Sequence, residues 1–163
     1  METKMYKFYG ASGRQDGVRR TGLHEWSLYY GYGEDGCGSY CWRALRTHAP
    51  SEREIRELVD GAINTRVQER ILSGMRYRGR IVWLSAENQR NLAFATALAR
   101  GGGIGALPTL KLGGTDEDCV LYTFADADEV AAFGAQVQAH IEGCIAAGRA
   151  EKAAVDWTAF QLE

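Results

Sequence analysis

The stretch SEREIRELVDGAINTRVQERIL, residues 51–72, decides the fold class because it separates two kinds of sequence. Ser51 and Glu54 have the spacing of a capping box, in which each side chain satisfies a free backbone amide at a helix N-terminus. Apolar residues then recur at helical spacing: Ile55, Leu58, Val59, Ala62, Ile63 and Val67. The stretch therefore predicts a helix that ends near Ser73 and Gly74.

The 50 residues before this helix predict β-structure. They are rich in Gly, Tyr and Trp and show no helical period. Aromatic-rich segments bounded by glycine turns indicate strands over residues 4–9, 24–30 and 40–45. Residues 10–22, GASGRQDGVRRTG, are expected to form a polar loop between the first two strands.

The segment after residue 74 predicts a short hairpin and a second helix. MRYRGRIVWL, residues 75–84, reads as two short strands around Arg78 and Gly79. Ser85 is placed to cap a helix, which GGGIG at 101–105 would end. The buried face of this helix is expected to use Leu92, Phe94, Ala95 and Leu98.

The last third predicts a second hairpin and a third helix. LPTLKL (107–112) and CVLYTF (119–124) read as strands joined by an acidic turn that contains Asp116, Glu117 and Asp118. Asp126 and Glu129 have capping-box spacing. The helix after them should end at Gly148, and its apolar positions are Val130, Phe133, Val137, Ile141, Cys144 and Ile145. Three apolar residues of the tail are expected to pack back: Val155, Trp157 and Phe160.

These elements predict an α+β fold with segregated blocks. Residues 1–50 would form aromatic-rich antiparallel hairpins, and residues 51–163 would form three helices with short β-hairpins. With 163 residues and 45% hydrophobic residues, the chain can bury a core without metals or disulfides. The opening METKMYKFYG lacks the apolar region of a signal peptide, so we expect a reducing cytoplasm and free thiols. No apolar run approaches the ~20 residues of a membrane helix.

The net charge of -2 conceals an asymmetry along the chain. Residues 1–100 carry 16 Lys and Arg against 11 Asp and Glu, whereas residues 101–163 carry 3 against 10. Such a chain can pair with copies of itself or dock one end on a charged partner. The alternative is that the two halves face each other within one fold.

The glycine-rich stretch YYGYGEDGCGSYC, residues 29–41, suggests three kinds of site. Gly31, Gly33 and Gly36 have dinucleotide-fingerprint spacing, but no helix signal follows and no βαβ unit surrounds them. Tetrahedral zinc is a second reading, with thiolate and imidazole ligands from Cys37, Cys41, His48 and His24. The third reading, which we favour, is a glycine-rich turn between two aromatic strands.

Other candidate sites are weaker. His140 and Cys144 share one helix face and are a second possible ligand pair, with a partly buried helix edge as the alternative. A basic and aromatic patch for nucleic acid would use Arg76, Arg78, Arg80, Tyr77 and Trp83. The pI of about 6.0 argues against it, so we expect a solvated hairpin with Trp83 turned inward. The sequence contains no nucleophile elbow, Walker loop or HExxH motif.

From about Glu54 onward the chain resembles a known family. The matching sequence segments are ILSGMRYRGRIVWLSAENQ (71–89), LPTLKLG (107–113), YTF (122–124) and DW (156–157). They resemble domain-of-unknown-function family 4376, a phage and prophage family with relatives fused to tail-fibre assembly proteins. The resemblance implies a virion-related setting, supplies no catalytic residues, and leaves the first 50 residues outside the domain.

The sequence therefore predicts a non-enzymatic phage protein without cofactor or metal. We expect a tail or tail-fibre component or assembly factor, in the host cytoplasm during assembly or in the virion, that binds a protein partner or further copies of itself. Tyr, Trp and Arg concentrate at protein interfaces. The expected partner-binding surface is Trp26, Tyr29, Tyr30, Tyr32, Tyr40 and Trp42. Two alternatives are an inhibitor of a host defence protein and a metal- or nucleotide-dependent enzyme.

Overall fold

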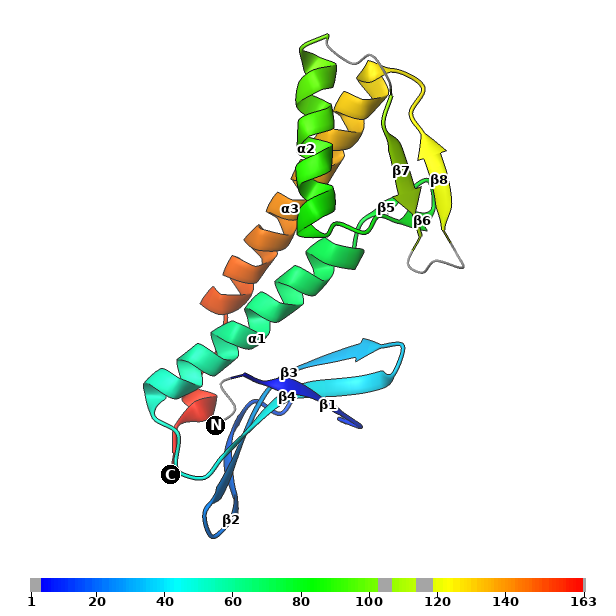
Figure 1. Cartoon of the computed structure of the whole chain (residues 1–163). Helices are drawn as coiled ribbons and strands as arrows, with labels where there is room; N and C mark the ends of the chain where they lie inside the picture. Colours follow the sequence, from blue (N-terminus) through cyan, green and yellow to red (C-terminus); the bar gives the residue numbers. More distant parts are fainter. Residues whose placement is uncertain (1–3, 103–106, 114–118, 163) are drawn as a thin grey trace. The chain divides into compact units, whose positions relative to one another are not determined.

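The computed structural model describes residues 4–102, 107–113 and 119–162, and it confirms the α+β class (Figure 1). The chain forms two compact units: unit 1 is Met1–Arg66 with Arg149–Glu163, and unit 2 is Val67–Gly148. The boundaries fall inside helix α1 (Glu52–Ser73) and helix α3 (Ala127–Ala153), not at residue 50 where the composition changes. The reason is that one face of the N-terminal sheet is buried against α1, so the sheet and this helix share one hydrophobic core.

Unit 1 contains a four-stranded antiparallel sheet. Its strands are β1 (Tyr6–Tyr9), β2 (Gly17–Gly22), β3 (Glu25–Asp35) and β4 (Gly38–Arg46), in the order β1-β4-β3-β2. Strand β2 lies within the expected polar loop. It pairs with β3, and Val18 is its one large apolar residue. A polar edge strand of this kind gives too little apolar alternation to be recognised without its partner.

The inner face of this sheet forms the core of unit 1. Successive strand residues point to opposite faces, so Leu28, Tyr30, Tyr40, Trp42 and Ala44 face inward and are buried. They pack with α1 and with the 3-10 helix η1 (Trp157–Phe160). The residues contributed by these helices and the tail are Ile55, Leu58, Val59, Ala62, Ile63, Val155 and Phe160. The expected return of the tail is confirmed.

The start of α1 confirms the first capping box. The Ser51 backbone N–H donates to Glu54 Oε2 at 2.8 Å, and the Glu54 N–H donates to Ser51 Oγ at 3.3 Å. Burial of the α1 apolar stripe then follows from its 3.6-residue period, as the sequence predicts.

Unit 2 contains two hairpins and the helix α2. Its elements are β5 (Arg76–Tyr77), β6 (Arg80–Ile81), α2 (Ala86–Arg100), β7 (Thr109–Leu112) and β8 (Val120–Thr123), together with the parts of α1 and α3 within Val67–Gly148. The β5–β6 turn places Arg78 and Gly79 at φ of 49° and 80°, the left-handed conformation that tight hairpins use. Ser85 caps α2 and Gly101 follows it. The acidic turn expected at 113–118 lies mostly outside the described residues.

The expected buried face of α2 and the expected inward turn of Trp83 are wrong. Phe94 and Leu98 are 68% and 39% exposed, whereas Leu92, Thr96 and Ala99 form the buried face of α2. Thr96 approaches Gly134 of α3 so closely that a Cβ there would lie 2.2 Å from the Thr96 hydroxyl, and this contact sets the rotation of the helix. Trp83 is 43% exposed and does not turn inward.

The third helix is longer than expected. Its buried residues Val130, Phe133 and Val137 confirm the apolar stripe, but Ile145 is exposed. The helix continues past Gly148, which is itself buried, to Ala153. Among the described residues, no helix combines the length and apolarity needed to cross a membrane.

Candidate functional site

The six aromatic residues predicted as a partner surface do not lie on one surface. Tyr30, Tyr40 and Trp42 are 0%, 8% and 3% exposed and belong to the core of unit 1. Trp26, Tyr29 and Tyr32 are half-buried and keep part of their surface accessible. The alternation of side chains along β3 separates neighbours, so Tyr29 faces outward where Tyr30 faces inward.

The outward side of the sheet carries a different group of residues. We call it the open face and define it as Tyr6, Phe8, Arg19, Tyr29 and Arg43. Tyr6 lies beside Arg43, and Arg43 lies beside Tyr29, on adjacent strands. The Arg43 Nε donates to the Tyr6 hydroxyl at 3.0 Å, and its guanidinium lies 4.0 Å from the centre of the Phe8 ring. The Arg19 guanidinium lies 5.8 Å from the Tyr29 ring.

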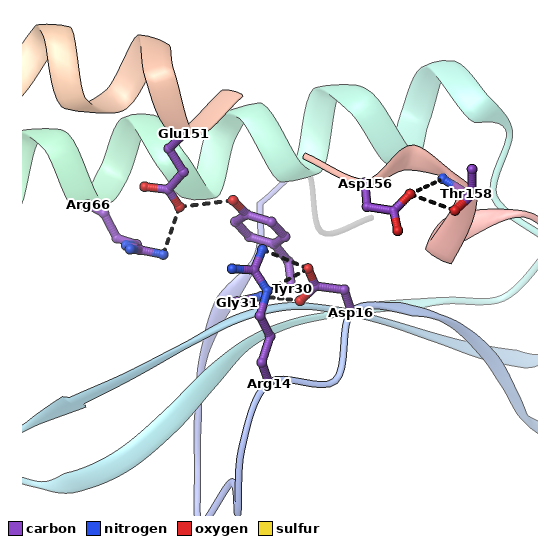
Figure 2. Close-up of polar contacts among 8 residues, drawn as sticks. All are labelled: Arg14, Asp16, Tyr30, Gly31, Arg66, Glu151, Asp156 and Thr158. Carbon is purple, nitrogen blue, oxygen red and sulfur yellow. Dashed lines mark hydrogen bonds and ion pairs between the residues drawn. The ribbon is translucent and has the colours of Figure 1, made fainter. Parts of the chain in front are cut away.

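A polar network fixes the inward residue Tyr30 (Figure 2). Its hydroxyl donates to Glu151 Oε1 at 2.9 Å, and Arg66 Nη1 lies 2.9 Å from the same oxygen. Burial, followed by the bond to Glu151, raises the pKa of Tyr30. The residue is therefore held as a neutral hydrogen-bond donor that ties the sheet to α1 and to the end of α3 in unit 1.

The second part of the network explains Gly31. Asp16 accepts the Gly31 N–H at 2.7 Å and pairs with Arg14 at 2.8 Å (Figure 2). Gly31 has φ of 64°, and a Cβ there would lie 3.3 Å from Arg66 Nη1. The backbone thus needs glycine at this bulge because of its conformation and the nearby guanidinium.

The remaining glycines of the apparent fingerprint are also structural. A Cβ on Gly33 would lie 2.6 Å from the Tyr40 ring, and Gly36 lies in the β3–β4 turn. Strand β4 follows this turn, whereas a dinucleotide fingerprint opens a helix. The spacing of these glycines therefore comes from a bulged hairpin.

The proposed zinc ligands are not brought together. Cys37 is exposed in the turn, Cys41 is buried, and His48 Nε2 lies 3.1 Å from Glu54 Oε1. Burial raises the pKa of the Cys41 thiol, which disfavours the thiolate that a metal would need. Across the described ranges, no three His, Cys, Asp or Glu side chains form a group suited to a metal ion. His140 contacts Cys144 Sγ at 3.7 Å and the Arg70 carbonyl at 3.0 Å.

A cavity of about 360 Å³ lies beside η1, between Ile55, Arg56, Trp157 and Phe160. Arg56 already pairs with Glu52 at 2.9 Å and stacks 4.4 Å from the centre of Trp157. In the described part of the chain, Trp42 Nε1 and Arg46 Nε are the buried side-chain polar atoms without a partner, and neither residue lines this cavity. The polar groups at the cavity are thus mostly engaged with one another.

In unit 2, Glu129 is the centre of a polar cluster. Its Oε1 accepts from Tyr77 at 2.9 Å, from Arg78 at 2.8 Å, and from the Tyr122 hydroxyl, while its Oε2 accepts the Ala125 N–H. The Ala125 N–H, followed by Tyr122, Arg78 and Tyr77, lowers the pKa of Glu129 from 4.5 to about 2. The hydrogen bond between the Tyr122 hydroxyl and Glu129 raises the pKa of Tyr122 to about 12. This cluster joins both hairpins to α3.

The Glu129 cluster also includes residues of the β5–β6 hairpin, which the sequence suggested as a basic patch for nucleic acid. Arg78 is paired with a carboxylate, and Tyr77 packs its ring 4.7 Å from that of Phe133. Arg76 donates to the Gly79 carbonyl. The arginine and aromatic residues predicted as a patch for nucleic acid are thus mostly engaged within unit 2.

Exposed apolar side chains are concentrated in unit 2. The described residues include ten exposed large hydrophobic side chains, and six of them lie between residues 67 and 148. These six are Trp83, Phe94, Leu98, Val120, Leu121 and Ile145. Phe94 and Leu98 are four residues apart on one side of α2, and we call this pair the α2 ridge. Sequence reasoning assigned the pair to the core because its spacing is that of a buried stripe.

The model of a protein family described as Domain of unknown function (DUF4376) matches residues 54–163. The chain belongs to this family. The match begins in α1 and takes in unit 2 and η1, so it contains the helices that cover the sheet but none of the sheet's strands. No curated protein and no solved structure matches the chain.

The bond between Tyr30 and Glu151 makes a prediction for stability. Tyr30→Phe removes a buried donor to a carboxylate, so we expect unfolding in urea to require about 2 kcal/mol less free energy. Tyr32→Phe is the matched control, because Tyr32 also donates to a carboxylate, Glu34, but at an exposed site. Its effect should stay within about 0.5 kcal/mol. Equal effects of the two substitutions would contradict the role given to Tyr30.

The lowered pKa of Glu129 predicts a pH dependence. The ionised carboxylate stabilises the folded state fully above its ordinary pKa of 4.5, and this contribution is lost as the pH falls toward about 2. Urea unfolding over this pH range should show a steep loss of stability in the natural protein. The slope should be shallower in Glu129→Gln, and identical slopes would show that Glu129 is not held in this way.

Proposed function

We propose that the protein is a non-enzymatic phage or prophage protein that acts through protein–protein contacts, as a tail or tail-fibre component or as an assembly factor. The α2 ridge is the observation that carries this proposal. A phenylalanine that is 68% exposed on a regular helix, with a leucine one turn later, is the kind of apolar surface that marks interaction sites.

The geometry of α2 favours a protein partner. The helix uses Leu92, Thr96 and Ala99 for the core of unit 2, and it presents Phe94 and Leu98 as a second apolar stripe. Anchors at i and i+4 of a helix are the pattern by which helices dock into apolar grooves. A partner groove that accepts both side chains would bury the surface that the chain itself leaves in water.

The resemblance to a phage and prophage family implies the virion-related setting that we propose. Relatives fused to tail-fibre assembly proteins suggest that the partner is a fibre or tail protein. The sheet outside the family match supports a role specific to this chain, and the partly accessible Trp26, Tyr29 and Tyr32 remain candidates for additional contacts.

Mutation of the α2 ridge tests this function in a phage that carries the gene. Phe94→Asp should reduce the yield of particles with complete tails, because loss of an interface anchor weakens binding by about 30-fold or more. Leu23→Asp is the matched control, since it places the same charge on an exposed apolar side chain of unit 1 that lies outside the open face. Particles would be counted by electron microscopy and by infectivity.

Three outcomes distinguish the alternatives. Normal tails and normal infectivity in folded Phe94→Asp would contradict the proposal. Normal tails with impaired growth only in hosts that carry defence systems would favour the inhibitor. Loss of tails with either substitution would show that the partner contacts a surface outside the α2 ridge as well.

A further inference from the structure

In the described part of the chain, the arginines of the sheet have no acidic partner. Elsewhere in unit 1, Arg14, Arg53, Arg56 and Arg66 each lie within 3 Å of a carboxylate oxygen. Among the described residues, no carboxylate pairs with any of the four sheet arginines: Arg19, Arg20, Arg43 and Arg46. All four of these arginines lie on β2 or β4.

Two of these arginines lie on the open face among aromatic rings. Arg43 is bracketed by Tyr6 and Phe8 of β1 and lies beside Tyr29 of β3, and all of its contacts are with neutral groups. Arg19 stands over Tyr29 from β2. The open face therefore offers guanidinium groups and π-faces side by side across all four strands.

The chain's pI of about 6.0 does not describe this surface. Unit 1 carries 12 Lys and Arg against 12 Asp and Glu. Among its described residues, most carboxylates contact groups outside the open face. Asp16 and Glu151 are within the Tyr30 network, whereas Glu52, Glu54 and Glu57 lie on α1. Glu25 and Glu34 stand at the two ends of β3, and Glu34 accepts the Tyr32 hydroxyl.

We propose that the open face binds single-stranded nucleic acid, with Arg19 and Arg43 contacting phosphates and Phe8 and Tyr29 stacking on bases. Phosphates complement guanidinium groups that have no carboxylate, and bases complement accessible aromatic rings on a sheet. A single strand presents both at once, because its bases are free of a duplex. An acidic protein segment would satisfy the charges but would leave the ring faces without planar partners.

The proposal is independent of the α2 ridge, which lies in the other unit. The substitutions that test the two surfaces therefore serve as controls for each other. A substitution on the open face should abolish nucleic-acid binding and leave tail assembly normal. A substitution on the α2 ridge should impair tail assembly and leave nucleic-acid binding normal. Failure of one proposal can therefore be told apart from failure of the other.

Fluorescence anisotropy with labelled oligothymidine of about 15 nucleotides tests the site in the full chain. We expect binding that weakens between about 50 and 200 mM salt. Arg19→Gln should reduce the slope of log affinity against log salt by about 0.7. Arg53→Gln is the control, because it removes the same charge from α1. Phe8→Ala should weaken binding about fivefold or more, whereas Phe94→Ala should leave it unchanged.

Three results would overturn the proposal. One is the absence of binding at about 50 mM salt. The second is binding that Arg19→Gln and Phe8→Ala do not alter. The third is equal competition by poly-glutamate, which would show an anion site without base stacking and favour an acidic protein segment. Circular dichroism of each variant checks that the sheet is intact, so that a loss of binding can be assigned to the open face.

Discussion

The burial of one face of the four-stranded sheet against α1 and η1 is the constraint on which the rest of unit 1 depends. A single antiparallel sheet must bury its apolar face against another element. In this chain, Leu28, Tyr30 and Trp42 pack against α1 and η1. The Tyr30 hydroxyl, which enters this interface, is satisfied by Glu151, and Arg66 balances the charge. The family match lacks the sheet, yet in this chain the sheet and the matched helices share one core.

The same burial creates the open face. When Tyr30 is fixed inward, strand alternation sends Tyr29 outward, where it meets Arg43 and Arg19. The bulge at Gly31 lets β3 continue to Asp35 and keeps Gly33 under the Tyr40 ring. One inward residue therefore determines which aromatic side chains stabilise the protein and which are available to a ligand.

Local signals predicted much of the fold. The capping box of Ser51 and Glu54, the Arg78–Gly79 turn and the stripe on α1 were readable because neighbouring residues determine them. Strand β2 could not be predicted from the sequence, since it is defined by its pairing with β3. The buried face of α2 depends on Thr96 meeting Gly134 of another helix, which no local period reveals. The aromatic surface was mistaken for the same reason: composition identified the residues, but register and the bulge decided that Tyr30, Tyr40 and Trp42 belong to the core.

The two proposed surfaces lie in different units, and both depend on a rigid scaffold beneath them. Native-state hydrogen exchange tests most directly whether the sheet and α1 form one cooperative unit. The amides of Leu28 and Trp42 in the sheet and of Val59 and Ile63 in α1 should open with the same free energy, equal to that of global unfolding of unit 1. Exchange of the sheet amides at a clearly lower free energy than those of α1 would show an appended module and would contradict the shared core.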